Sequence, residues 1–115
     1  GAAEVSGVQN QEVHIPCQGY KNTPGESVLL ILWYKDSIPV PIYSFDARTQ
    51  NGRHWIDEVV LGDRSQFISN VPEPYLRLQR IQPQDEGVYI CRVDYRRKPT
   101  LRGKTQLSVI TKQQA

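Results

Sequence analysis

The sequence lacks the residue patterns that mark most enzymes and metalloproteins. It has no CxxC pair and no His/Cys cluster, so a structural zinc site is not expected. It has no GxSxG nucleophile turn and no phosphate-binding glycine loop. Asp57 and Glu58 are adjacent, so in a strand their carboxylates would point to opposite faces and would not converge on a substrate. We therefore expect no catalytic residues, no cofactor and no metal.

Excess charge and long apolar runs are also missing. The net charge of +2 over 115 residues is too balanced for a protein held to nucleic acid by its phosphates. The longest apolar run, VLLILWY, is too short to span a membrane, and the opening GAAEVSG has no signal-peptide regions. We expect one domain, residues 1–115 with a core over 5–111, that is a mature chain or part of a longer protein.

Cysteine is scarce, because Cys17 and Cys91 are the only two. A disulfide between them would close a loop of about 75 residues and contribute roughly 4 to 5 kcal/mol by chain-entropy reasoning. Such a bridge predicts an oxidising, extracellular setting. The cysteine count alone leaves open the alternative of two buried free thiols in a cytosolic protein.

The rest of the sequence consists of short alternating segments separated by turn residues such as TPGE, QNGR and VPEP. In YLRLQRI, for example, Leu76 and Leu78 share one face and Arg77 lies on the other. No segment has a helical stripe, so an antiparallel sandwich or barrel is expected. The predicted strands cover residues 11–18, 28–35, 40–46, 64–69, 75–80, 87–95 and 102–111.

The order Cys17, Trp33, Cys91 favours the sandwich over the barrel. In an immunoglobulin domain, a tryptophan on strand C packs against the disulfide that joins strands B and F. Tyr89 stands two residues before Cys91, where the tyrosine corner requires a hydroxyl that bonds the backbone. The length between Trp33 and Cys91 leaves room for strand C′ and a further strand, which predicts an all-β, variable-type immunoglobulin sandwich.

The stretch DEGVYIC, residues 85–91, resembles the immunoglobulin signature DxGxYxC. Gly87 in this stretch would allow a close backbone approach. The resemblance implies that Asp85 pairs with an arginine near the start of strand D, the position of Arg64. Asp85 is therefore expected to be structural.

A candidate binding surface follows from the inward direction of Trp33 and Cys91. Their strand neighbours point outward, and these are Leu32, Tyr34, Ile90, Arg92 and Asp94. Strand 40–46 adds either Tyr43 and Phe45 or Ile42 and Ser44, and we prefer the aromatic pair because Ile42 suits the core. Apolar residues ringed by charge are typical of an interface, although a neighbouring domain could cover this face, or its apolar residues could be scattered.

This surface yields a quantitative expectation. Tyr34→Ala and Phe45→Ala should each cost about 2 kcal/mol of binding and leave folding intact. Beside the surface, the basic stretch YRRKPTLRGK, residues 95–104, either steers an acidic partner or is a solvated hairpin tip. Sulfated polymers are a further possible ligand for it, although the low net charge argues against strong binding.

One run is more specific than the general signature. ILWYKDSIPVPIYSFDAR, followed by HWIDE, LGDRSQF and DEGVYICRVDY, resembles the first immunoglobulin domain of the Sidestep family of neuronal cell-surface proteins. The resemblance covers roughly residues 28–109. It implies a membrane-distal domain of a longer ectodomain, recognised in axon guidance or synaptic matching by immunoglobulin proteins of the Beaten path family. The expected contact surface is the face of strands 102–111, 87–95, 28–35 and 40–46, the G-F-C-C′ face.

Two other functions remain open from the sequence. Arg92 resembles the essential arginine of sialic-acid-binding immunoglobulin lectins, and a guanidinium suits bidentate capture of a carboxylate. Those lectins typically move their disulfide off strand F, whereas Cys91 is in place, and Arg92 could instead pair with Asp36 or Asp46. The third possibility is homophilic adhesion or a structural spacer.

Overall fold

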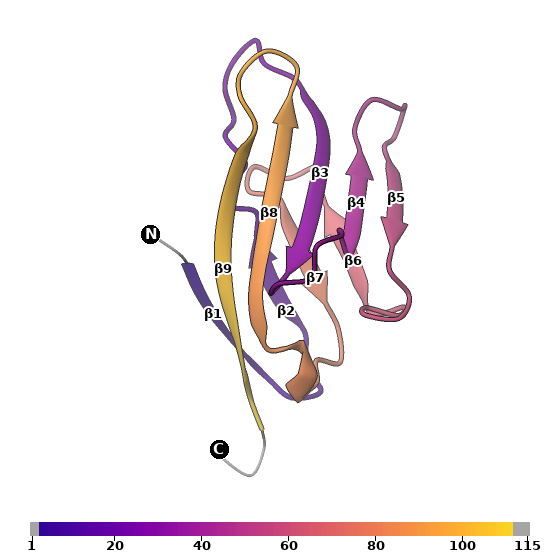
Figure 1. The fold of residues 1–115 in the computed structure, drawn as a ribbon, viewed down its shortest axis with the longest axis vertical. Helices are drawn as coiled ribbons and strands as arrows, with labels where there is room; N and C mark the ends of the chain where they lie inside the picture. The colour runs from indigo at the N-terminus through magenta and orange to yellow at the C-terminus, as the bar shows by residue number, and fades with distance from the viewer. Residues whose placement is uncertain (1–2, 112–115) are drawn as a thin grey trace.

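The computed structural model describes residues 3–111, which form nine strands and one 3-10 turn (Figure 1). The elements are β1 (Ala3–Val8), β2 (Val13–Pro16), β3 (Val28–Lys35), β4 (Tyr43–Asp46), β5 (Arg53–Ile56), β6 (Ser65–Ile68), β7 (Tyr75–Leu78), η1 (Pro83–Asp85), β8 (Gly87–Tyr95) and β9 (Leu101–Ile110). One sheet has the order β1-β9-β8-β3-β4-β5 and the other β2-β7-β6. Figure 1 shows the smaller sheet packed behind the larger one, as predicted for an immunoglobulin sandwich.

All seven predicted strands are present, and those over 28–35 and 87–95 have the predicted bounds. The strand predicted over 40–46 begins only at Tyr43. Pro39 and Pro41 precede it, and proline cannot donate to a strand ladder. Two further strands complete the larger sheet: β1 pairs with β9 in parallel, and β5 pairs with β4 antiparallel.

The core lies between the sheets around the Cys17–Cys91 disulfide, which confirms the predicted bridge over the alternative of free thiols. The Cα atoms of the two cysteines are 5.2 Å apart, and Trp33 is fully buried within the same core. The Trp33 ring lies 6.2 Å from the Phe67 ring of the opposite sheet. Burial of large aromatics on both inner faces holds the two sheets together.

A buried ion pair closes the bottom of the sandwich, and the partners are those that the signature implied. The Arg64 guanidinium donates to both carboxylate oxygens of Asp85 at 2.8 and 2.9 Å, and this bond raises the pKa of Arg64. The Tyr89 hydroxyl donates to the Asp85 carbonyl at 2.6 Å, as expected for a tyrosine corner. The backbone N–H of Gln82 also donates to the Asp85 carboxylate, at 2.7 Å. Asp85 therefore organises the fold.

The close approach expected at Gly87 is present and involves a side chain from the neighbouring strand end. Gly87 has a φ of +150°, and a Cβ there would lie 2.6 Å from Asp36 Oδ1. The Asp36 carboxylate accepts a hydrogen bond from the Val88 N–H at 2.9 Å. Glycine thus makes room for a carboxylate that ties the end of β3 to the start of β8.

Candidate functional site

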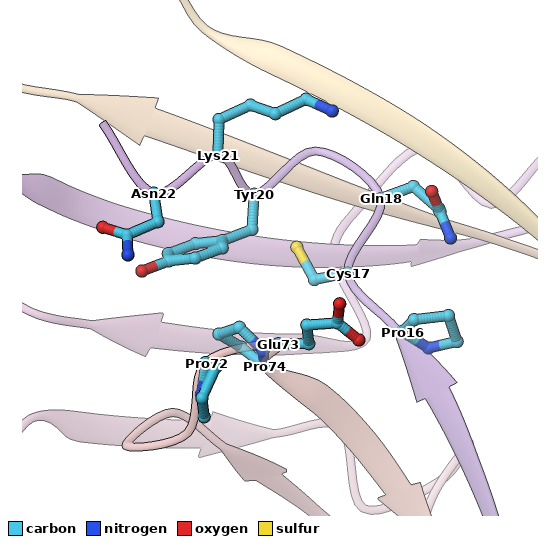
Figure 2. Close-up of a pocket in the computed structure, with 9 residues that line it drawn as sticks. All are labelled: Pro16, Cys17, Gln18, Tyr20, Lys21, Asn22, Pro72, Glu73 and Pro74. Carbon is cyan, nitrogen blue, oxygen red and sulfur yellow. The ribbon is translucent and has the colours of Figure 1, made fainter. Parts of the chain in front are cut away.

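One surface hollow lies beside the disulfide. Figure 2 shows this hollow, about 350 Å³ in volume, between residues 16–22 and 72–74. The Cys17 sulfur there belongs to the disulfide, and Lys21 and Glu73 are single charges of opposite sign. No group of three potential metal ligands occurs among residues 3–111. Within the same residues, no helix is long and apolar enough to cross a membrane.

The larger sheet has an outer face that the smaller sheet does not cover, and we call it the open face. In a strand, residues alternate between faces, and directly paired residues of neighbouring strands share a face. The open face therefore carries the residues that alternate with the buried ones on β3, β4, β5, β8 and β9. These include Leu30, Leu32, Tyr34, Ser44, Asp46, Trp55, Ile90, Arg92, Asp94, Arg102 and Lys104.

One row of the open face runs across five strands. Leu32 pairs with Arg92 on β8 and with Ser44 on β4, Ser44 pairs with Trp55 on β5, and Arg92 pairs with Arg102 on β9. Trp55 is 53% exposed, a large fraction for a large aromatic side chain. It lines a hollow of about 440 Å³ together with Leu30, Leu32, Ser44, Asp46, Arg53 and His54.

A second hollow lies at the β3–β4 turn. It has a volume of about 320 Å³, and its lining includes Tyr34, Ile38, Ile90 and Arg102. Ile38 is 37% exposed, and Val40 in the same turn is 56% exposed. The two hollows together give the open face an apolar and aromatic surface with charged groups beside it, the composition expected of an interface core.

The structure places Leu32, Tyr34, Ile90, Arg92 and Asp94 on the open face, where the sequence predicted them, and all five are partly buried. Whether they bind a partner stays a prediction. Their neighbour Trp55 was missed because β5 had no predicted bounds. The available signal was the stretch RHWI, residues 53–56, in which Arg53 and Trp55 are two positions apart and therefore lie on the same face of a strand.

The outward placement of Tyr43 and Phe45 was wrong. Tyr43 is fully buried and Phe45 is only 7% exposed. Tyr43 pairs directly with Trp33, and paired residues share a face, so both point into the core. Ile42 precedes β4 and is also fully buried, so three nearly consecutive apolar residues hide the alternation. Ser44 takes the outward position instead.

Tyr43 has a structural task at the edge of the sandwich. Its hydroxyl accepts a hydrogen bond from the Phe67 N–H on β6 at 2.9 Å and shares a hydrogen bond with His54 Nδ1 on β5 at 2.5 Å. Burial raises the pKa of the Tyr43 hydroxyl and lowers the pKa of His54. The hydroxyl thereby connects the edge strands of the two sheets.

The alternative partners considered for Arg92, Asp36 and Asp46, are not the residues with which it pairs. Arg92 donates through Nε and Nη2 to Asp94 on its own strand, at 3.0 and 3.1 Å, and Thr100 donates to the same carboxylate at 2.8 Å. Asp46 pairs with Arg48 instead, and Asp36 lies 3.3 Å from Lys35. The bond to Asp94 raises the pKa of Arg92. A sialic-acid carboxylate would have to displace Asp94 from this bidentate pair.

Comparison with known proteins defines the class. The model of the immunoglobulin V-set domain family matches residues 1–110. The chain therefore belongs to the immunoglobulin V-set family, whose members are typically recognition modules without enzymatic activity. No curated protein matches the sequence.

Several solved structures share this fold. A structure of CD84 is similar with a TM-score of 0.77 at 15% identity, covering 97% of this chain and all of that one. The extracellular domain of the voltage-gated sodium channel beta4 subunit gives 0.70 at 15% identity, covering 96% and 92%. The Dpr11 IG1 structure, bound to DIP-gamma, gives 0.65 at 17% identity, covering 96% and 100%. At such identities, the similarity concerns the fold.

Proposed function

We propose that this chain is an extracellular recognition domain of a cell-surface protein and that it binds an immunoglobulin-type protein partner through the open face. One observation carries the proposal: the open face exposes Trp55 over an apolar hollow beside Leu32, with Tyr34 and Ile90 lining a second hollow. Contiguous apolar patches with charged rims are uncommon on monomers that bind nothing. The disulfide supports an extracellular setting.

The structural neighbours give this proposal context. The sodium channel beta4 extracellular domain forms parallel homodimers that explain its role in cell–cell adhesion, and the first immunoglobulin domain of Dpr11 is bound to DIP-gamma. These statements concern those proteins. By analogy of fold, we infer that this chain recognises a protein as well.

We further propose that the partner is a Beaten path-type immunoglobulin protein and that the domain is the membrane-distal domain of a Sidestep-type protein. The run ILWYKDSIPVPIYSFDAR, which carries that resemblance, covers most of β3, the β3–β4 turn and all of β4. It therefore supplies Leu32, Tyr34, Ile38 and Ser44 to the open face. The most family-specific part of the sequence thus coincides with the middle of the proposed interface.

Surface plasmon resonance against a panel of purified Beaten path ectodomains tests this proposal, with a sialylated glycan surface in parallel. We expect saturable binding to one or a few of the proteins. Trp55→Ala and Tyr34→Ala should each weaken it by about 2 kcal/mol, roughly thirtyfold, within the range of interface hot spots.

Tyr75→Ala is the matched control, because Tyr75 is a partly buried aromatic on β7 of the other sheet, stacked on His14 at 4.3 Å. It should leave the affinity unchanged. Equal losses in all three variants would place the binding site elsewhere. Signal on the glycans with none on the proteins would replace this proposal with the lectin function.

A further inference from the structure

The charge of this nearly neutral chain is strongly segregated. Residues 92–104 hold six basic side chains and one acidic one, a formal charge of +5, while the other residues hold eight basic and eleven acidic ones, −3. Figure 1 places the β8–β9 hairpin at the top of the long axis, and η1 and the β5–β6 connection in the lower half. Asp57, Glu58, Asp63 and Glu86 lie in or beside the latter segments.

Four of the six hairpin cations form no salt bridge among residues 3–111: Arg96, Arg97, Arg102 and Lys104. We call these four the basic edge, and all are exposed. The remaining two are engaged, since Arg92 pairs with Asp94 and Lys98 donates to Thr23 at 2.8 Å. An exposed cation outside a salt bridge can contact an incoming anion, although Arg97 and Arg102 also interact at longer range with Glu26 and Asp94.

The basic edge continues directly into the open face. Lys104 pairs with Ile90 and Arg102 pairs with Arg92, so both basic side chains stand on the open face beside its apolar residues. Arg102 also lines the hollow of Tyr34 and Ile90. The pairing of Arg102 with Arg92 sets two like charges directly opposite each other, which destabilises a sheet. Asp94, which pairs with Arg92 and also attracts Arg102, reduces this repulsion.

The tip of the hairpin is held in place by the chain that precedes β3. The Glu26 carboxylate accepts hydrogen bonds from the backbone N–H groups of Arg97 at 2.9 Å and Lys98 at 3.3 Å. The Arg96 N–H donates to the Ser27 carbonyl at 2.8 Å. Arg96 and Arg97 are therefore presented on an ordered loop, so less ordering entropy is lost when an anion binds.

The surroundings of the basic edge favour a different protein over a second copy of this chain. The carboxylates on or beside the open face are already engaged: Asp46 with Arg48, Asp94 with Arg92, and Asp36 with the Val88 N–H. Two open faces placed together would therefore oppose unpaired cations without free carboxylates to match them. A sulfated polysaccharide would match the cations, but it would leave Trp55 and the apolar hollows without a contact.

We propose that the basic edge receives an acidic surface on the protein partner and sets the rate at which the two proteins associate. This inference rests on the proposed function and names the chemistry of the partner. Charges at the rim of an interface act mainly on the association rate and its salt dependence, and steering raises that rate by about 10- to 1,000-fold in total.

The test measures association and dissociation rates with the Beaten path ectodomain that binds the wild-type domain. Arg102→Gln/Lys104→Gln should slow association roughly three- to tenfold near 0.1 M salt. The difference should vanish near 1 M salt, where the Debye length falls from about 10 Å to about 3 Å. The control Arg77→Gln/Arg80→Gln removes the same amount of charge, from Arg77 on β7 and from Arg80 just after β7. Both positions lie outside the open face, so the association rate should not change.

The outcomes separate the two proposals. Binding by the wild type with the same association rate in both double variants would overturn this inference and leave the proposed function standing. Absence of binding to any ectodomain would overturn both. Retention of the domain on immobilised heparin, lost in Arg102→Gln/Lys104→Gln while protein association is unaffected, would make the basic edge a polysaccharide site and also overturn this inference.

Discussion

Phe45→Ala distinguishes the structure from the surface predicted by the sequence alone. If Phe45 pointed outward, its removal would weaken binding and spare the fold. In the structure, it is only 7% exposed, and its ring lies 5.5 Å from that of Phe67 and 4.9 Å from that of His54. A Cβ at Gly52 would fall directly on the Phe45 ring, so the ring is also covered from that side.

The expected loss of folding free energy follows from this packing. Removing a buried phenylalanine side chain costs about 3 to 5 kcal/mol, a large part of the roughly 5 to 15 kcal/mol of a typical domain. With an m-value near 2 kcal/mol/M, the urea midpoint should fall by about 1.5 to 2.5 M. Fluorescence of buried Trp33 reports the transition.

Tyr34→Ala is the control, because Tyr34 lies on the open face and its loss should cost no more than about 1 kcal/mol of folding free energy. The reasoning fails if Phe45→Ala keeps the wild-type urea midpoint and weakens partner binding. That result would restore the outward position of Phe45 and the interface that included it.

Two further predictions concern titratable groups. Asp85→Asn should lower the free energy of unfolding by roughly 3 kcal/mol, because it leaves the partly buried Arg64 without its anion. The control Asp63→Asn breaks an exposed ion pair and should cost less than about 1 kcal/mol, with both values measured by urea denaturation. Equal effects of the two substitutions would contradict the structural role of Asp85. Burial lowers the pKa of His54, so the unfolded chain takes up a proton first as the pH falls below about 6.5, and stability should decrease on acidification. His54→Gln should therefore reduce the drop in melting temperature between about pH 7.5 and 5.5, and an unchanged drop would show that His54 does not contribute.

Much of the fold could be predicted because a few structural residues must be of a particular type and at a particular spacing. A disulfide, a tryptophan packed beside it and a tyrosine two residues before Cys91 occur together in this order in immunoglobulin domains. The ion pair of Arg64 and Asp85 followed from the same signature. These residues act through fixed spacing, and spacing is visible in a sequence.

The candidate site was harder to predict because it depends on register. Which face a residue of β4 occupies is decided by the β3–β4 turn, and Ile42, Tyr43 and Phe45 are all apolar, so composition does not show the direction. A slip of one residue exchanges the two faces of a strand. The partner of Arg92 was hidden for a related reason: Asp94 is two positions along the same strand, and such neighbours also share a face.

The parallel pairing of β1 with β9 has a mechanical consequence. The two strands run side by side from Ala3 opposite Thr105 to Val8 opposite Ile110. Tension applied between the start of β1 and the end of β9 would slide one strand along the other, so the whole ladder would resist in shear instead of opening one bond at a time. If the ladder ruptured, the disulfide between residues 74 apart would still withhold about 250 Å of chain from extension. Such a domain should need a high force to unfold, and its extension should be limited to the chain outside the disulfide loop.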